Sequence, residues 1–185
     1  SKKVNFKKLN VLSKLEIKKV IHDIKPNNIF YLAGQSSIPK SFNLSKETND
    51  SNFTGAKNFL EIIEKEKINT TFFKANSGYI FKPNNGVIDL KCSLIKPNNP
   101  YVKAQQSAYK LIKKYRLRNL NCYSLIFMQI ESPLRDKNFF IKKVCLHAKK
   151  RKKVVVGNIF TLRDYSWIED IVKGVYYATF IKPCD

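Results

Sequence analysis

The sequence predicts an α/β fold in which a parallel sheet carries helices on both faces. Short apolar runs rich in β-branched and aromatic residues alternate with segments whose apolar residues recur every three or four positions. Strands that are apolar throughout are typical of parallel sheets, because helices bury both of their faces. The length of 185 residues and the hydrophobic content of 43% fit one folded domain, or most of one.

Four apolar runs are predicted to form the strands, at residues 28–34, 70–78, 120–133 and 154–158. The segments between them have helical periodicity, at residues 13–26, at residues 52–67 and from Tyr101 onward. Ser13 is a suitable N-cap for the first helix, and Pro26 is a suitable stop signal. In a parallel sheet, ligands bind where strands reach their carboxyl ends. The sequences "LAGQSS" and "ANSG" are expected at that edge.

The most extreme feature of the composition is its charge, which is +21 at pH 7 with an isoelectric point near 9.9. Such a charge first suggests nucleic acid, and "HAKKRKK" at residues 147–153 is the densest cluster. The other lysines are spread along the chain beside many Asn and Ile residues, as a compositional bias would produce. No RNP-like motif, zinc finger or KH-type glycine loop accompanies them. A solvated basic face is therefore expected, and a specific nucleic-acid partner is not.

Cysteine and histidine usage predicts no metal site. The four cysteines are far apart without a C-x-x-C motif, and there are only two histidines. Reduced thiols favour a cytoplasmic protein. No stretch approaches the roughly 20 apolar residues of a membrane span, and the Lys-rich start does not resemble a signal peptide. We therefore expect neither a metal nor a membrane partner.

Four sequence blocks, taken in order and spacing, resemble the GDP-mannose 4,6-dehydratases. They are "IKPNNIFYLAGQSSIPKSF", "NPY", "IESPLRDKNFF" and "GNIFTLRDYSWIEDIV". This family belongs to the extended short-chain dehydrogenase/reductases, which are Rossmann-fold enzymes that act on nucleotide sugars with NADP. The resemblance implies that residues 1–185 form a partial NAD(P)-binding domain with the start of a substrate-binding region. It also implies that the first strands are missing, that residues 4–9 are the third strand, and that homo-oligomers are possible.

The resemblance also implies roles for individual residues. Ser77 would hydrogen-bond the sugar hydroxyl that is oxidised, and Tyr101 would be the acid/base that takes its proton. The positions implied to contact NADP are Leu32, Ala33, Gly34, Gln35, Ser36, Tyr101, Gln105 and Arg135. Those implied to contact the nucleotide sugar, GDP-mannose or a similar compound, are Gln129, Glu131 and Arg163.

The sequence departs from the family pattern at positions that matter for catalysis. A phenol with a pKa near 10 is a poor base unless a nearby cation lowers that pKa. The family places a lysine at the position of Gln105, one helical turn after Tyr101, and a proton-abstracting glutamate at the position of Tyr79. Lys103 is expected to point to a different face of the helix and so not to replace the missing lysine. There is also no G-x-x-G-x-x-G motif for the pyrophosphate.

Three functions remain open from the sequence. The first is a nucleotide-sugar dehydratase or epimerase-like enzyme. The second is a non-catalytic relative that binds a sugar nucleotide or a partner, which the loss of both the lysine and the glutamate favours. The third, a basic nucleic-acid-binding module, is supported by charge alone and predicts binding that weakens steeply with salt.

Overall fold

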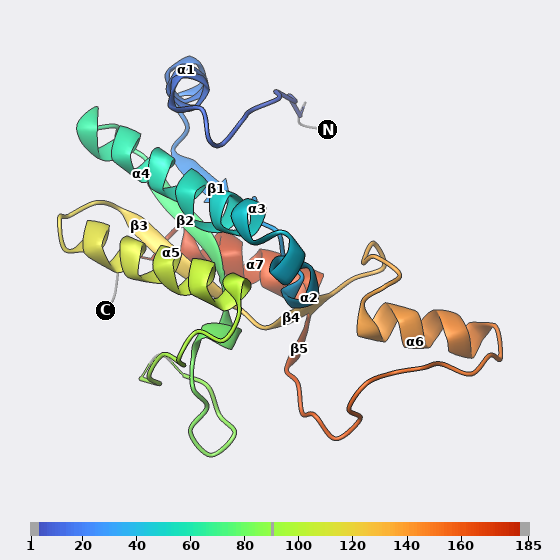
Figure 1. Ribbon diagram of the computed structural model, residues 1–185. Helices are drawn as coiled ribbons and strands as arrows, with labels where there is room; N and C mark the ends of the chain where they lie inside the picture. The colour runs from blue at the N-terminus through green and yellow to red at the C-terminus, as the bar shows by residue number, and fades with distance from the viewer. Residues whose placement is uncertain (1–3, 90, 182–185) are drawn as a thin grey trace. The chain divides into compact units, whose positions relative to one another are not determined.

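The computed structural model describes residues 4–89 and 91–181, and they form two compact units divided after Ile126 (Figure 1). The first unit contains a three-stranded sheet, and the second contains a two-stranded one. The α/β class predicted from the sequence is confirmed. That residues 1–185 form one partial NAD(P)-binding domain remains a prediction.

The sheet of the first unit contains β1 (Asn28–Tyr31), β2 (Thr71–Ser77) and β3 (Cys122–Phe127), in that order. Strands β1 and β2 are parallel, and Tyr31 is the register partner of Lys74. The helices of this unit are α1 (Lys14–Ile24), α2 (Ile38–Asn43), α3 (Ser45–Asn49), the π-helix η1 (Asp50–Thr54), α4 (Gly55–Lys65), the 3-10 helix η2 (Gly78–Ile80) and α5 (Pro100–Arg116).

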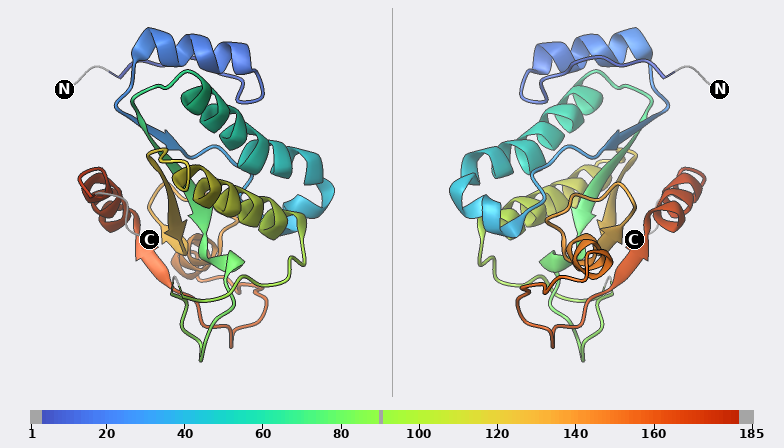
Figure 2. Two further views of the ribbon diagram at one scale, coloured as in Figure 1. Left: turned by 90° about the vertical axis from the view of Figure 1, so that its left-hand side faces the viewer. Right: turned by 90° about the vertical axis from the view of Figure 1, so that its right-hand side faces the viewer.

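Helices α4 and α5 lie side by side over one face of this sheet (Figure 2). Apolar side chains from the helices and strands meet there in one cluster, and fully buried members include Ile17, Leu60 and Phe72. On the other face, the Phe73 ring stacks with the rings of Phe30 and Tyr123, at centroid distances of 4.9 and 5.0 Å. The alternation of side chains along β2 therefore supplies apolar groups to both faces, as expected for a buried parallel strand.

Local signals explain where the long helices begin. The Ser13 hydroxyl accepts a hydrogen bond from the Glu16 amide at 3.3 Å, as its position before α1 predicts. The Asn99 side chain caps α5 by accepting from the Val102 amide at 2.8 Å, and Pro100 occupies the first helical position. In the α4 region, Gly55 is required because an added Cβ atom would lie 2.1 Å from the Tyr31 hydroxyl.

The second unit contains β4 (Gln129–Glu131), α6 (Phe140–Lys149), β5 (Tyr165–Trp167) and α7 (Ile168–Ala178). Strands β4 and β5 are parallel and pair from Gln129 with Tyr165 to Glu131 with Trp167. The apolar run at residues 120–133, predicted to be one strand, is thus divided between β3 and β4, which belong to different sheets.

Two predicted strands are wrong. Residues 4–9 are irregular, and Phe6 is 93% exposed, while Leu9 packs against the core and Lys7 pairs with Asp23 of α1 at 3.2 Å. Residues 154–158 are also irregular. Both segments have strand-like composition, but a strand exists only where another strand offers hydrogen bonds, and neither segment has such a neighbour among the described residues.

Within the described residues, no helix is long and apolar enough to cross a membrane. The same part of the chain contains no group of three or more His, Cys, Asp or Glu side chains that could hold a metal ion.

Candidate functional site

The first unit brings together three of the residues implied in catalysis or cofactor binding. Ser77 is the last residue of β2, Tyr101 lies in the first turn of α5, and Gln105 lies one turn further along that helix. Their exposed fractions are 5%, 8% and 5%, so all three are buried. Lys103 is exposed, which confirms that it lies on a different face of α5 from the buried Tyr101 and Gln105.

Burial is the largest influence on the pKa of Tyr101 and raises it. Hydrogen bonding to Ser77 and to Gln105 lowers the pKa of Tyr101, and the nearby Tyr79 raises it. Ser77 and Gln105, the groups that lower this pKa, are both neutral. Tyr101 therefore has hydrogen-bonding neighbours, but its hydroxyl is not activated by a cation.

Gln105 is fixed by an amide that sequence reasoning did not identify. Its Nε2 donates to Oδ1 of Asn52 at 3.0 Å. The Nδ2 of Asn52 in turn donates to the backbone carbonyls of Gln35 and Thr48, each at 3.0 Å. Asn52 is 98% buried because the π-helix η1 turns it inward, and no local sequence pattern indicates that turn. The position of Gly34 is also explained, since an added Cβ atom would lie 2.3 Å from Asn52 Oδ1.

The Oε1 atom of Gln105 is buried and has no hydrogen-bond partner among the described residues. Its Nε2 is already committed to Asn52, so the amide cannot rotate to satisfy this oxygen without losing that bond. A buried carbonyl oxygen without a donor costs roughly 1–3 kcal/mol. A ligand hydroxyl or amine that donates to Oε1 would remove this cost.

Residues 32–36, implied to contact the cofactor, form the turn directly after β1. Leu32, Ala33, Gly34 and Ser36 are exposed. Gln35 instead stabilises the turn, because its Nε2 donates to the Ser37 carbonyl at 2.9 Å and to the Thr48 hydroxyl at 3.1 Å. The turn thus presents backbone and small side chains at the carboxyl end of a strand, which is where parallel sheets bind ligands.

A buried lysine lies near the middle of β2, three residues before Ser77. Lys74 is 99% buried, and its ammonium lies 5.6 Å from the centroid of the Tyr31 ring and donates to the Ala75 carbonyl. Burial lowers the pKa of Lys74 to about 8. The groups that shift the pKa of Tyr101 are Ser77, Gln105 and Tyr79, so Lys74 does not supply the charge that position 105 lacks.

The remaining predicted site residues belong to the second unit. Gln129 and Glu131 are the first and last residues of β4, and Glu131 is buried. Arg163 lies next to Asp164, whose carbonyl accepts from the Gln129 amide at 3.1 Å, so β4 pairing brings Arg163 and Gln129 into one region. The guanidinium of Arg135 lies 3.5 Å above the Phe139 ring centroid, and its buried Nε has no partner among the described residues.

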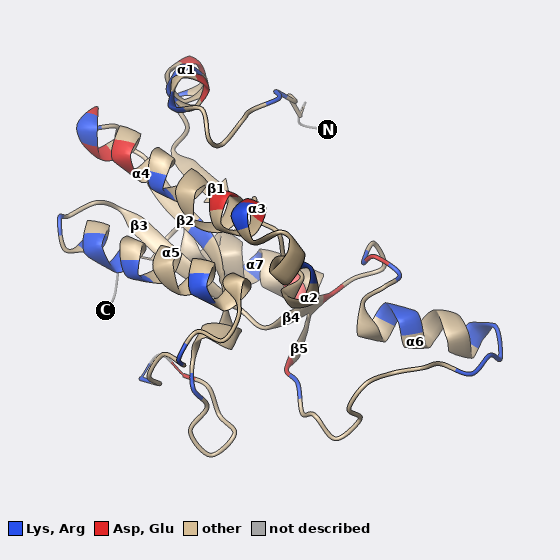
Figure 3. Ribbon diagram, in the orientation of Figure 1, with Lys and Arg blue, Asp and Glu red and all other residues tan. Residues whose placement is uncertain are grey.

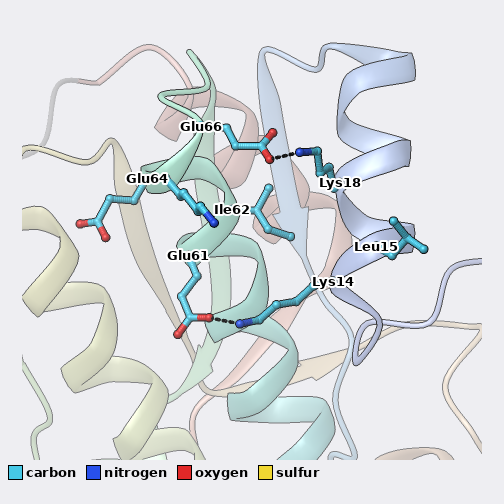
Figure 4. A pocket seen from close by; sticks show the side chains of 8 residues that line it. Lys14, Leu15, Lys18, Glu61, Ile62, Glu64 and Glu66 are labelled. Carbon is cyan, nitrogen blue, oxygen red and sulfur yellow. Dashed lines mark ion pairs between the residues drawn. The ribbon is translucent and has the colours of Figure 1, made fainter.

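A pocket between α1 and α4 is lined by Lys14, Leu15, Lys18, Glu61, Ile62, Glu64, Lys65 and Glu66 (Figure 4). Its charges are largely paired with each other. Lys14 lies 2.5 Å from Glu61 and Lys18 lies 2.6 Å from Glu66, and these lysines lower the pKa of both carboxyl groups. Charged groups that are already paired with each other are not available to bind a ligand. We therefore place the candidate site around Tyr101 and not in this pocket.

Solved structures of known proteins share the fold of this chain. The chain superimposes with a TM-score of 0.79 on UDP-glucose 4-epimerase from Thermus thermophilus, at 19% identity, covering 94% of this chain and 60% of that one. The TM-score is 0.78 for a dTDP-glucose 4,6-dehydratase from Streptomyces venezuelae, at 13% identity, covering 90% and 51%. The chain therefore has a Rossmann-like α/β fold, which these solved structures share over only part of their own length.

Sequence comparison identifies the family within that class. The model of the GDP-mannose 4,6 dehydratase family matches residues 1–180, and the chain belongs to this family. It is 25% identical to human GDP-mannose 4,6 dehydratase over 166 residues and 27% identical to the Arabidopsis thaliana GDP-mannose 4,6 dehydratase 1 over 163 residues. These matches cover 85% and 83% of the chain, but 45% of each relative, so the chain spans about half the length of these relatives.

Proposed function

We propose that this chain binds a nucleotide sugar at the Tyr101 site and does not dehydrate it. The observation that carries the proposal is the buried Tyr101 hydroxyl, which has the neutral groups of Ser77 and Gln105 beside it. Family membership supports the ligand class, because the matching relatives are GDP-mannose 4,6 dehydratases.

The chemistry of Tyr101 follows from its surroundings. A tyrosine begins with a pKa near 10, and burial raises it further here. At neutral pH the hydroxyl keeps its proton, so it donates hydrogen bonds and does not remove a proton from a sugar. Dehydration additionally needs a base at the neighbouring ring carbon, and Tyr79 at the corresponding position is another phenol. Tyr101 and Ser77 can therefore hold a sugar hydroxyl without activating it.

NADP is the proposed cofactor, and solved neighbours include a Pseudomonas aeruginosa protein complexed with NADPH. The unpartnered Oε1 of Gln105 fits a ribose hydroxyl, which would donate to it. Leu32, Ala33, Gly34, Gln35 and Ser36 would contact the cofactor from the turn after β1, and Arg135 would offer its unpaired Nε to a phosphate. A bound nicotinamide would supply the hydride acceptor.

A further set of sugar-nucleotide contacts is proposed from the resemblance to the family. Gln129, Glu131 and Arg163 are proposed to contact GDP-mannose or a similar compound, with Arg163 near the diphosphate because a guanidinium suits its oxygens. Three cysteines, Cys92, Cys122 and Cys145, are free thiols, which supports the proposed cytoplasmic location.

The test is to separate binding from turnover. The purified chain is titrated with GDP-mannose by calorimetry, with and without NADP, and the same mixtures are analysed by mass spectrometry for a keto-deoxy sugar nucleotide. We expect heat of binding and no product, and Tyr101→Phe should weaken binding several-fold by removing one hydrogen bond. Product formation would instead support the alternative, an active dehydratase with unusual catalytic groups. Absence of both binding and product would exclude either function for this chain.

A further inference from the structure

Positive charge gathers on α5 without acidic neighbours in the sequence. Between Asp89 and Glu131 the chain contains eight Lys or Arg residues and no Asp or Glu. In contrast, α1 and α4 carry both signs (Figure 3). On those helices Lys14, Lys18 and Lys57 lie 2.5, 2.6 and 3.6 Å from carboxylates. Lysine is abundant in both regions, but only around α1 and α4 is it neutralised.

Three of the α5 lysines form a straight row, here called the α5 stripe, which consists of Lys103, Lys110 and Lys114. Together with Ser107 they are spaced by four, three and four residues, which places them on one face of a helix. All three lysines are exposed, and none has a carboxylate partner among the described residues. At 1.5 Å per residue the row is about 16 Å long.

We propose that the α5 stripe binds the phosphodiester backbone of a nucleic-acid strand. A row of single-sign charges on a rigid helix matches a linear polyanion, because lysine binds a phosphate as a point charge at any base sequence. A membrane surface fits less well, since membrane-binding helices combine cations with large apolar side chains and this row interleaves its lysines with Ser107. Such contacts need none of the sequence-reading motifs that are missing from the chain. The surface is separate from Tyr101, which lies on the buried face of the same helix.

The test measures binding of fluorescein-labelled dT20 to the chain as a function of salt. Removing three phosphate contacts should reduce the slope of log K against log salt by about 2, because each contact with a single strand contributes about 0.7. For Lys103→Gln/Lys110→Gln/Lys114→Gln, the affinity at 0.1 M salt should therefore fall about 100-fold. The variant leaves every residue of the Tyr101 site unchanged, so its effect is distinguishable from a failure of nucleotide-sugar binding.

Two matched triple variants remove the same charge elsewhere. Lys14→Gln/Lys18→Gln/Lys57→Gln alters lysines that carboxylates already neutralise. Lys149→Gln/Lys150→Gln/Lys152→Gln alters the basic cluster at the C-terminal end of α6. Each should change the affinity less than fivefold, with folding checked by circular dichroism. Equal losses in all three variants would show a general effect of net charge and overturn the proposal. It would also be overturned by a larger loss in the α6 variant, or by tighter binding of phosphatidylserine vesicles or polyglutamate than of dT20.

Discussion

Two sets of buried polar side chains, one around Tyr101 and Gln105 and one at Lys74, differ in their charge and in their hydrogen-bond partners. Around Tyr101 and Gln105 the side chains are neutral and joined by hydrogen bonds to Ser77 and Asn52. At Lys74, two positions along β2 from the neighbouring Asn76, an ammonium is buried with one carbonyl partner and no carboxylate among the described residues. The fold therefore holds a buried lysine at position 74, whereas no cation is among the groups that shift the pKa of Tyr101.

The energetic meaning of this difference is set by desolvation. A buried ammonium without a counter-ion is destabilising while it stays protonated, whereas a neutral amide with a partner is close to neutral in energy. The uncharged Gln105 therefore avoids the desolvation cost that a lysine would carry at this buried position. The charge at position 74 contributes a cost with no contact to the candidate site.

The largest expected change in stability comes from removing the Lys74 charge, which would leave both sets of buried side chains uncharged. Its folded-state pKa of about 8 lies below the ordinary 10.5, so protonated Lys74 opposes folding. Lys74→Met fills the same space without charge and should raise the free energy of unfolding by about 3 kcal/mol at pH 7. Urea unfolding measures this change, and the exposed Lys110→Met should change stability by less than about 0.5 kcal/mol.

The pH dependence gives an internal check on Lys74. Because its pKa is lower in the folded state, the unfolded chain binds more protons between about pH 8 and 10.5. The destabilisation caused by protonated Lys74 is therefore complete below about pH 8 and is lost as the pH rises through that window. The difference between wild type and Lys74→Met should shrink steadily over the same range. A constant difference would mean that Lys74 acts through packing and not through its charge.

A second, smaller change in stability is expected when a charge is added beside Tyr101. Gln105→Lys restores a cation one turn after Tyr101, but at a position that is 5% exposed. The new ammonium can keep one bond to Asn52 and loses hydration, so we expect a destabilisation of about 2 kcal/mol. Dehydration of GDP-mannose should stay undetectable, since Tyr79 still occupies the position of the base.

Gln105→Met is the matched control for this change, because it replaces the amide with a side chain of similar length, removes the bond to Asn52 and adds no charge. It should cost about 1 kcal/mol. Turnover in Gln105→Lys would show that the lysine alone was missing and that Tyr79 is compatible with catalysis. Equal stability of the two variants would indicate that water reaches position 105 and that the site is wetter than the surroundings of Lys74.

Much of the first unit could be predicted from local sequence. Helix periodicity together with Ser13 and Pro26 predicts both ends of α1 to within two residues. Strands β1 and β2 end at or next to the sequences "LAGQSS" and "ANSG", which are expected at the carboxyl edge of the sheet. Strand composition misled at residues 4–9 and 154–158, because composition does not reveal whether a partner strand exists.

The polar contacts of the site were beyond sequence reasoning for a different reason. Asn52 and Gln105 are separated by 53 residues, and their bond depends on a π-helix that places Asn52 inward. The burial of Lys74 is equally a property of packing, since Phe72, Lys74 and Asn76 alternate like any strand face. That face of β2 becomes buried only when helices α4 and α5 pack over it.

The smallest expected effect concerns the cap that sets the position of Tyr101. Asn99 Oδ1 accepts from the Val102 amide at 2.8 Å, and Tyr101 lies between them in the first turn. Asn99→Ala should lower the free energy of unfolding by about 1 kcal/mol. Because fraying would move the Tyr101 hydroxyl away from Ser77, nucleotide-sugar binding should weaken by more than stability alone explains. Asn99→Asp keeps the acceptor and adds a charge favoured at a helix N-terminus, so it should retain both properties. If Asn99→Ala loses stability but binds GDP-mannose unchanged, the ligand does not depend on the geometry of Tyr101, and its hydrogen bonds must come from elsewhere.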